Sequence, residues 1–526
     1  MEDDRADEVD PSRTSLFALK RRRDKFRKGL TELLGKSEAT DFLQLIWSLN
    51  ALQNGQFDLA KRFGPNFSRI EMEQARERFR FAPWWLETLV NEYLTTSFNP
   101  GRQVLDLKHP GSANGLVGAL SALENAEDGV WLKTGNIFHL IGHLSQRQFP
   151  WQRGFAYFLQ FYRPLFVFDF PEAEARFEGR VGISISQFAL CGFALRAHLG
   201  TTPFAAMDID LQEIGISPHE RDVAIRKVSL PLLAARRQAT NLRAEAGLTG
   251  YKKSVLRQSP CLILPDGRQL IAPLPDLIAL RISSGIYYDI VGDGAINERM
   301  GKRFEDYVAL LLDTFLPDIG VRRETEYSIR KGENYRSSDL VLTINGVAPF
   351  IVECKAKRAS HSAKFAESPS EAEGLSDLAH GIFQIWRHVS HHRRRLVGKD
   401  MILSASPIGV LLTLDTWADM SRPTREEIFR LAREIRQSKA PDIAEEDMIR
   451  IGFLHIEDFE GILSTATPES LIAAAERWLG DSKYDGWSLR TVHAEAPGRK
   501  EVDHGPMFDR LPRPSGMSWW TPLARP

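Results

Sequence analysis

Residues 337–342 read SSDLVL and residues 351–357 read IVECKAK. Both are short apolar runs that charged residues interrupt. Strands seldom carry Asp, Glu or Lys among consecutive apolar residues, because burying an isolated charge is costly. The charges become tolerable if a divalent cation neutralises Asp339 and Glu353 and if Lys355 faces an anion. The pattern therefore predicts a metal-binding site on two neighbouring strands.

The turn between these strands limits how such a site can form. Glu353 and Lys355 are two residues apart, so their side chains point to the same face of their strand. Asn345-Gly346 is a strong turn signal. A strict two-residue turn would pair Asp339 with Val352, which places Asp339 and Glu353 on opposite faces. A three-residue loop or a bulge would instead pair Asp339 with Glu353, and we predict one of these two arrangements.

The segments around the two strands predict elements in the order α-β-β-β-α-β. Hydrophobic periodicity and turn residues define each of them. The expected elements are a helix over 296–315, strands over 321–329, 338–344 and 349–356, a loop over 360–376, a helix that runs through residue 389, and a buried strand over 408–414.

An aspartate beside one strand, a turn, and a second strand with Glu-x-Lys together resemble the active-site hairpin of the PD-(D/E)xK, or restriction-endonuclease-like, nuclease superfamily. The resemblance covers residues 301–414. Ser338 stands where the family often has a proline before the aspartate, a departure that is common among its members. The resemblance implies an α/β fold with an αβββαβ core, in which a mixed sheet is flanked by helices.

The resemblance extends to two further side chains. Many members carry a glutamate on the helix before the first strand, and here Glu305 lies at the edge of that helix's apolar stripe, whereas Asp306 points further toward solvent. Gln384 lies on the helix after the motif, where RecB-like members carry a glutamine. His388 replaces the tyrosine that accompanies this glutamine in those members, so the resemblance is to the superfamily and not to that branch.

The resemblance also implies the chemistry of the site. Asp339 and Glu353, with the backbone carbonyl of Cys354, would hold Mg²⁺ through oxygen ligands, and Mn²⁺ should substitute for it. Glu305 would contribute directly or through water. Lys355 would orient the nucleophile or stabilise the charge on the phosphate, and Gln384 would position the lysine or touch the phosphate.

The expected activity is therefore hydrolysis of phosphodiester bonds. We expect DNA rather than RNA as the substrate and an endonuclease rather than an exonuclease, with a role in defence, restriction or repair. One alternative is a catalytically inactive relative that binds nucleic acid or acts in assembly. Another is a helical scaffold in which Asp339, Glu353 and Lys355 are incidental charges on an exposed hairpin.

Basic residues near the motif are the expected contacts to nucleic acid. They are Arg387, Arg393, Arg394, Arg395 and Lys357. A second basic run at 20–28 is expected to be a solvated helix face. His139 and His143 have the spacing of a metal pair on one helix face, but no third ligand lies nearby in the sequence, which favours packing histidines.

Composition bounds the rest of the chain. With 526 residues, 43% of them hydrophobic, several domains are expected. We predict a mostly helical domain over 1–255 for recognition or assembly, with homo-oligomerisation left open. The nuclease-like domain is expected over 256–482 and a tail rich in Pro and Gly over 483–526.

The charge balance and the cysteines exclude several classes of protein. A net charge of −1 means that any surface for nucleic acid must come from local patches. The three cysteines are far apart, which excludes a zinc ribbon and a disulfide framework. The acidic start at 2–10 and the short apolar window at 181–195 predict a cytoplasmic protein without a membrane partner.

Overall fold

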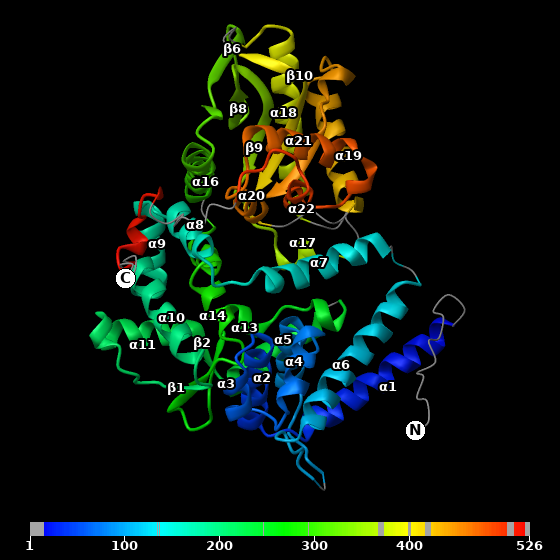
Figure 1. Ribbon diagram of the computed structural model, residues 1–526, viewed down its shortest axis with the longest axis vertical. Helices are drawn as coiled ribbons and strands as arrows, with labels where there is room; N and C mark the ends of the chain where they lie inside the picture. The colour runs from blue at the N-terminus through cyan, green and yellow to red at the C-terminus, as the bar shows by residue number, and fades with distance from the viewer. Residues whose placement is uncertain are drawn as a thin grey trace. The chain divides into compact units, whose positions relative to one another are not determined.

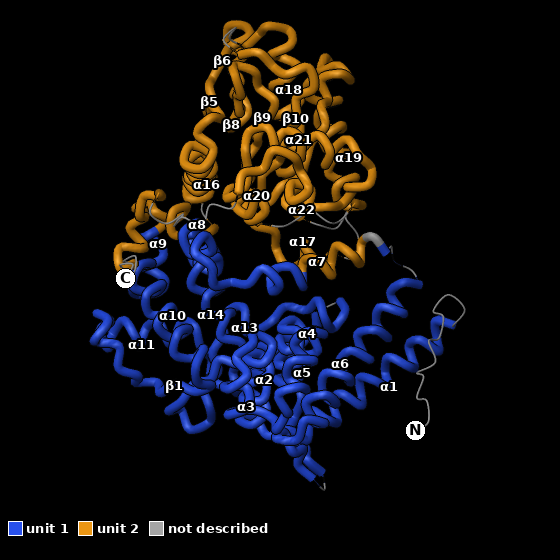
Figure 2. The backbone as a smooth tube through the Cα atoms, in the orientation of Figure 1, with its two compact units in different colours: residues 1–137, 147–164, 174–290 blue, residues 138–146, 165–173, 291–526 orange. Residues whose placement is uncertain are grey.

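A computed structural model describes residues 15–520, apart from 102, 134, 136, 246, 293, 367–372, 398–400, 416–421 and 502–509. The chain has a mixed α/β structure (Figure 1) and divides into two compact units (Figure 2). The helical unit comprises residues 1–137, 147–164 and 174–290, and the sheet unit comprises residues 138–146, 165–173 and 291–526. The division at residue 290 differs from the predicted boundary at 255.

The helical unit contains the helices predicted for the first half of the chain. Helix α5 begins at Pro83, because proline fits the first turn of a helix, where its missing N–H costs nothing. The helices are α1 (Leu16–Gly35), α2 (Ala39–Gln53), α3 (Phe57–Phe63), α4 (Arg69–Glu77), α5 (Pro83–Leu94), α6 (Pro110–Trp131), α10 (Ile185–Leu199), α11 (Pro218–Val228), α12 (Leu232–Ala244), α13 (Val255–Gln258), α14 (Asp276–Arg281) and α15 (Tyr287–Ile290). Helices α7 (Ile137–Arg153), α8 (Phe158–Val167) and α9 (Pro171–Val181) have residues in both units.

A small sheet explains why the helical unit extends beyond residue 255. Its strands are β1 (Phe204–Ala206), β2 (Ser229–Pro231), β3 (Cys261–Ile263) and β4 (Gln269–Ile271), in the order β1-β4-β3-β2. Strands β3 and β4 form a hairpin around Asp266-Gly267, and these strands pair with β2 and β1, respectively. Residues 256–290 therefore belong to the helical unit and not to the sheet unit, although the nuclease-like domain was expected to begin at residue 256.

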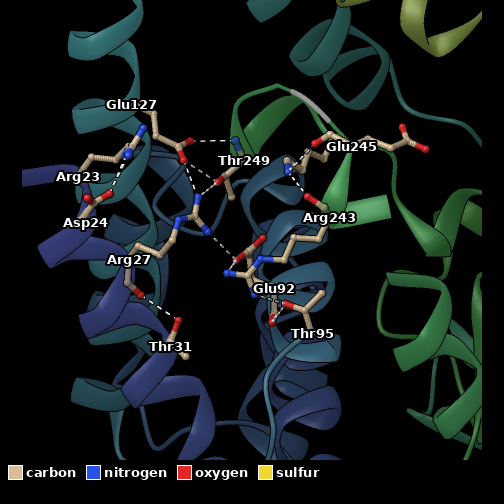
Figure 3. Close-up of polar contacts among 11 residues, drawn as sticks. Arg23, Asp24, Arg27, Thr31, Glu92, Thr95, Glu127, Arg243, Glu245 and Thr249 are labelled. Atoms are coloured by element: carbon tan, nitrogen blue, oxygen red, sulfur yellow. Dashed lines mark hydrogen bonds and ion pairs between the residues drawn. The ribbon is translucent and has the colours of Figure 1, made fainter. Parts of the chain in front are cut away.

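A network of ion pairs joins helices α1, α5, α6 and α12 in the helical unit (Figure 3). Arg27 contacts Glu127 at 2.6 Å and Glu92 at 3.4 Å, and Arg243 contacts Glu92 at 3.6 Å. Glu92 and Glu127 are buried, so they need these partners. Arg27 belongs to the basic run at 20–28, but its side chain binds buried carboxylates of α5 and α6. Most other residues of the run are exposed, as expected for a solvated face.

The sheet unit is built on a mixed five-stranded sheet. Its order is β11-β10-β9-β8-β5. The strands are β5 (Gly320–Arg323), β8 (Leu340–Ile344), β9 (Val347–Lys355), β10 (Ile402–Thr413) and β11 (Ile451–His455). Strands β9, β10 and β11 are parallel, whereas β8 is antiparallel to both β9 and β5.

Helices cover both faces of this sheet, because the central strands carry apolar side chains that point to both faces. Ile351 of β9 and Leu411 of β10 pack against α18 (Leu375–Arg393) and α19 (Arg422–Lys439). Phe350 and Val410 instead line an apolar space shared with helices of the opposite face. Those helices are α16 (Gly294–Phe315), α20 (Ile456–Ile462), α21 (Pro468–Gly480) and α22 (Leu489–Ala494).

Two regions of the sheet unit differ from the prediction. The strand predicted over 321–329 is divided, since β5 pairs with β8 while β6 (Glu326–Arg330) forms a separate hairpin with β7 (Glu333–Arg336). The predicted tail at 483–526 begins with ordered structure, because Leu489 and Val492 of α22 are buried. Among the described helices, none combines the length and the apolar character needed to cross a membrane.

Candidate active site

The turn between β8 and β9 combines a tight loop with a bulge. Asn345 and Gly346 have φ values of 51° and 81°, and Ile344 pairs with Val347, so the turn has two residues. The predicted alternative of a three-residue loop is therefore wrong. The ladder shifts by one residue immediately beyond the turn, in the part of β9 that contains Pro349. Proline cannot donate to the ladder, which makes this a natural place for a bulge.

The bulge sets the register that the site requires. Beyond it, Leu342 pairs with Phe350 and Leu340 pairs with Val352. Continuing this register by one residue places Asp339 opposite Glu353. The predicted bulge is thus present and brings the two carboxylates to corresponding positions of the hairpin.

Asp339 is held where β8 begins. Its side chain is 8% exposed, and its Oδ2 accepts a hydrogen bond of 2.7 Å from the backbone N–H of Cys354. Burial raises the pKa of Asp339, and this hydrogen bond and Lys355 offset part of the rise. The backbone just before it is also fixed, because the N–H of Ser338 donates to Nδ1 of His388 at 3.2 Å.

Glu353 and Lys355 form a pair beneath α18. Lys355 Nζ donates to Glu353 Oε1 at 2.9 Å and to Gln384 Oε1 at 3.2 Å. Glu353 is 1% exposed, and its other oxygen, Oε2, is buried without a hydrogen-bond partner in the described part of the chain. A buried acceptor of this kind is costly unless a ligand satisfies it.

The electrostatics of this pair favour retention of protons. Burial raises the pKa of Glu353 to about 8, with Asp339 and Glu305 adding to the rise and Lys355 opposing it. Burial lowers the pKa of Lys355, but the charge and the hydrogen bond of Glu353, together with the charge of Asp339, raise it by more, so the net shift is upward. The ammonium of Lys355 therefore stays charged at neutral pH, and Glu353 and Glu305 hold their protons more tightly than carboxyl groups in water do.

Gly381 allows α18 to approach strand β9 closely. A Cβ atom at this position would lie 2.8 Å from Cε of Lys355 and 2.6 Å from Cδ1 of Leu411. This close packing brings Gln384, about one helical turn further on, within reach of Lys355. Sequence reasoning missed Gly381. The available signal was a glycine on the apolar face of a helix, one turn before the predicted glutamine.

Glu305 comes from α16, on the opposite face of the sheet. Its neighbour Phe304 is fully buried, and Glu305 itself pairs with Lys302 at 2.6 Å. Burial and the neighbouring charge of Asp339 raise the pKa of Glu305 to about 7. Asp306 instead pairs with Arg323. The choice of Glu305 over Asp306 as the inward carboxylate therefore agrees with the structure.

One cavity of about 610 Å³ brings the predicted residues together. It is lined by all five side chains predicted to be catalytic and by Cys354. Those five are Glu305, Asp339, Glu353, Lys355 and Gln384. Further charged residues on its walls are Glu172, Glu298, Arg299, Lys302, Glu324 and Arg336. Sequence reasoning did not identify this second set, because its members are scattered over the chain without a motif.

The donor chemistry of the cavity suits a hard divalent cation such as Mg²⁺, because carboxylate oxygens predominate. The unpartnered Oε2 of Glu353 is the specific feature that fits. Within the described residues, however, no group of three or more His, Cys, Asp or Glu side chains is already gathered as a metal site. Oδ2 of Asp339 accepts a hydrogen bond from the backbone N–H of Cys354, and Oε1 of Glu353 accepts one from the ammonium of Lys355.

The predicted nucleic-acid contacts lie outside the lining of this cavity. Three of them are engaged in ion pairs, since Arg393 binds Asp447, Arg394 binds Asp442 and Lys357 binds Asp377. Arg395 is exposed and follows α18 with a φ of 58°. Arg387 lies over two aromatic rings.

The histidine pair of α7 has a packing role. Nε2 of His139 and Nε2 of His143 lie 2.6 Å and 3.1 Å from the carbonyl oxygen of Ala366. This agrees with the expectation of packing histidines. The predicted loop at 360–376 includes α17 (His361–Lys364), while its residues 367–372 lie outside the described part.

Comparisons with known proteins provide no relative from which to transfer a function. Neither the family models, nor the curated proteins, nor the solved structures gave a match to this chain. The assignment therefore depends on the geometry of the cavity and on the resemblance of the motif.

Proposed function

We propose that the protein is a metal-dependent nuclease that hydrolyses phosphodiester bonds, with DNA as its substrate. The observation that carries this proposal is the shared cavity. All five residues that the sequence predicts to be catalytic, which lie between positions 305 and 384, line this cavity. The helix and strands around it follow the order expected of an αβββαβ core, with the β6–β7 hairpin as an addition.

The metal would be held by Asp339 and Glu353, with the carbonyl of Cys354 and a direct or water-mediated contribution from Glu305. When bound, Mg²⁺ would stabilise negative charge on the phosphate and lower the pKa of a water molecule. Oε2 of Glu353 is the acceptor that such a cation would satisfy. Neutralising these carboxylates would also remove their repulsion of a phosphate.

Lys355 would act on the phosphate or on the nucleophile. Two of the three N–H groups of its ammonium are used by Glu353 and Gln384, which leaves one donor for a phosphate oxygen or a water. The pair of hydrogen bonds fixes the direction of the side chain, so no reorganisation is needed as charge develops. Gln384 acts in this scheme as a positioning residue.

A cleavage assay tests the proposal. Purified full-length protein is incubated with end-labelled linear, nicked and single-stranded DNA and with RNA, in Mg²⁺, Mn²⁺ or EDTA. The Asp339→Asn and Lys355→Ala variants should lose about 10²- to 10³-fold in rate, the scale of removing one preorganised charge from a reacting centre. Glu298→Gln, which changes an exposed carboxylate on the same cavity wall, is the matched control.

Two outcomes would contradict the proposal. Cleavage that persists unchanged in both variants would place the reaction elsewhere in the molecule. Binding of nucleic acid without metal, and without cleavage of any of the substrates, would support the alternative of a binding or assembly module.

A further inference from the structure

Arg387 lies on α18 close in sequence to Gln384, which lines the cavity. It follows Gln384 by about one turn on the same helix face, about 5 Å further along the axis. Gln384 lines the cavity, and so does Arg336 at the end of the β6–β7 hairpin. Arg387 and the hairpin therefore border the same edge of the site.

The guanidinium of Arg387 lies over two aromatic rings. Its Cζ lies 5.3 Å from the ring centroid of Tyr335 and 5.5 Å from that of Phe383. Aromatic faces attract a guanidinium and fix its plane without using its N–H groups. The rings thus restrain the guanidinium without occupying its N–H groups.

The hairpin that supplies one ring is itself anchored on α18. Tyr327 and Tyr335 are cross-strand partners, and their rings stack with centroids 5.9 Å apart. The Tyr327 hydroxyl lies 2.9 Å from Nδ1 of His391, and the ring of Tyr335 packs edge-on against the same histidine. Arg387 therefore lies where the β6–β7 hairpin packs against α18.

Arg387 has no hydrogen bond or ion pair to any described residue, although its Nε is buried. The other arginines near the end of α18 differ, since Arg393 and Arg394 are neutralised by Asp447 and Asp442. A guanidinium has five donors and no acceptor, so a restrained and unsatisfied one is suited to an oxyanion. Phosphate is the oxyanion that the neighbouring cavity is proposed to receive.

We propose that Arg387 binds a non-scissile phosphate of the strand whose neighbouring bond lies in the cavity. This inference rests on the proposed nuclease function and adds its substrate class: a polynucleotide strand that continues past the scissile bond, rather than an isolated phosphodiester. The contact positions the strand and carries no base specificity. Arg387 is thus a binding residue outside the reacting centre.

The test compares an oligonucleotide with a small diester. The Arg387→Met variant keeps the apolar stem and removes the charge, whereas Arg387→Lys keeps a charge without the planar fork. Arg433→Met is the matched control, because Arg433 of α19 is exposed, lies 6.0 Å from the ring centroid of Phe429 and does not line the cavity. The substrates are a single-stranded DNA 20-mer and bis(p-nitrophenyl) phosphate, which has no second phosphate.

Arg387→Met should lower the ratio of kcat/KM for the 20-mer to that for the small diester about tenfold, as expected for losing one charge-assisted hydrogen bond. Arg387→Lys should lose less, and Arg433→Met should keep the wild-type ratio. In a series of 20-mers with one neutral methylphosphonate each, the variant's deficit should disappear at a single position next to the cleaved bond. An equal loss on both substrates, or a deficit that persists at every methylphosphonate position, would overturn the inference.

Binding measurements separate this inference from the nuclease proposal. In EDTA, where cleavage is blocked, fluorescence anisotropy with the labelled 20-mer should show a slope of log Kd against log salt that is smaller by about one in Arg387→Met. A normal slope together with active cleavage would reject the Arg387 site alone. The reduced slope in a protein that cleaves nothing would retain the phosphate contact and reject the nuclease.

Discussion

Gly381 and Lys355 are packed so closely that a Cβ on the glycine would lie 2.8 Å from Cε of the lysine. The same Cβ would lie 2.6 Å from Cδ1 of Leu411 on strand β10, so it would clash with side chains of two neighbouring strands at once. The position of α18, and with it the hydrogen bond from Lys355 to Gln384, depends on the absence of a side chain here.

Gly381→Ala is therefore expected to destabilise the protein by about 1–3 kcal/mol, the range for overpacking a buried site, and to lower the cleavage rate. Denaturant titration and the cleavage assay measure the two effects. Gly118→Ala is the control, because Gly118 lies in helix α6 with no atom near its Cβ position, and alanine should stabilise that helix slightly. Normal stability and activity in Gly381→Ala would contradict this account of the contact.

His388 is expected to fix the backbone next to Asp339. Its Nδ1 accepts the N–H of Ser338, so His388→Ala would leave a buried donor unsatisfied at a cost of about 1–3 kcal/mol. Asp339 would also be less well placed, which should reduce kcat. His388→Asn presents an acceptor at a similar distance from the backbone and should recover part of both losses. Equal behaviour of the Ala and Asn variants would show that the hydrogen bond is not the cause.

Buried histidines lower the free energy of unfolding at acidic pH. Burial lowers the pKa of His143, His388 and His493 to about 4, from an ordinary value of 6.5. Between these pH values the unfolded chain binds more protons at these histidines than the folded one, so their contribution to stability is full above pH 6.5 and is lost as the pH falls toward 4. The fall should be shallower in His388→Asn. Urea titrations at a series of pH values measure it, and identical slopes in the two proteins would contradict the assignment.

Mg²⁺ is expected to raise the melting temperature of metal-free protein. A ligand that binds only the folded state stabilises it by about 2.7 kcal/mol at a hundred times its Kd. Asp339→Asn and Glu353→Gln should lose this shift, while Glu298→Gln should keep it. Differential scanning fluorimetry at constant ionic strength measures the effect. A full shift in both site variants would mean that the ion binds elsewhere.

The ion-pair network of the helical unit predicts that Arg27 contributes to stability. Arg27→Leu would leave Glu127 without its cation, and breaking a buried pair in this way costs about 3–5 kcal/mol. Arg21→Ala, an exposed position of the same basic run, should change little. Thermal melts compare the two variants. Similar small effects in both would assign Arg27 to the solvated face after all.

Local patterns predicted much of the sheet unit. The helix at α16 and the strands β8, β9 and β10 occur close to the expected residues, because their apolar runs are nearly continuous and bounded by turn residues. The choice between Glu305 and Asp306 also followed from helix periodicity. The requirement that Asp339 lie opposite Glu353 predicted either a three-residue loop or a bulge, and the structure has the bulge together with a two-residue turn.

Other features depend on contacts between distant parts of the chain. Strands β3 and β4 pair with strands from residues 204–231, which moved the boundary of the helical unit to residue 290. The burial of α22 depends on helices packed around it and not on a strong pattern of its own. The second set of charged residues in the cavity, such as Arg299 and Glu324, likewise comes together only through the fold.

Given the bulge beside the Asn345-Gly346 turn, the number of residues between Asp339 and Glu353 decides whether their side chains lie on the same face of the sheet. Side chains alternate along a strand, so gaining or losing one residue between them would turn one carboxylate to the other face of the sheet. A change of two residues would preserve the phase. Homologous chains that keep the site should therefore vary this hairpin in even steps, or carry a compensating bulge wherever the step is odd.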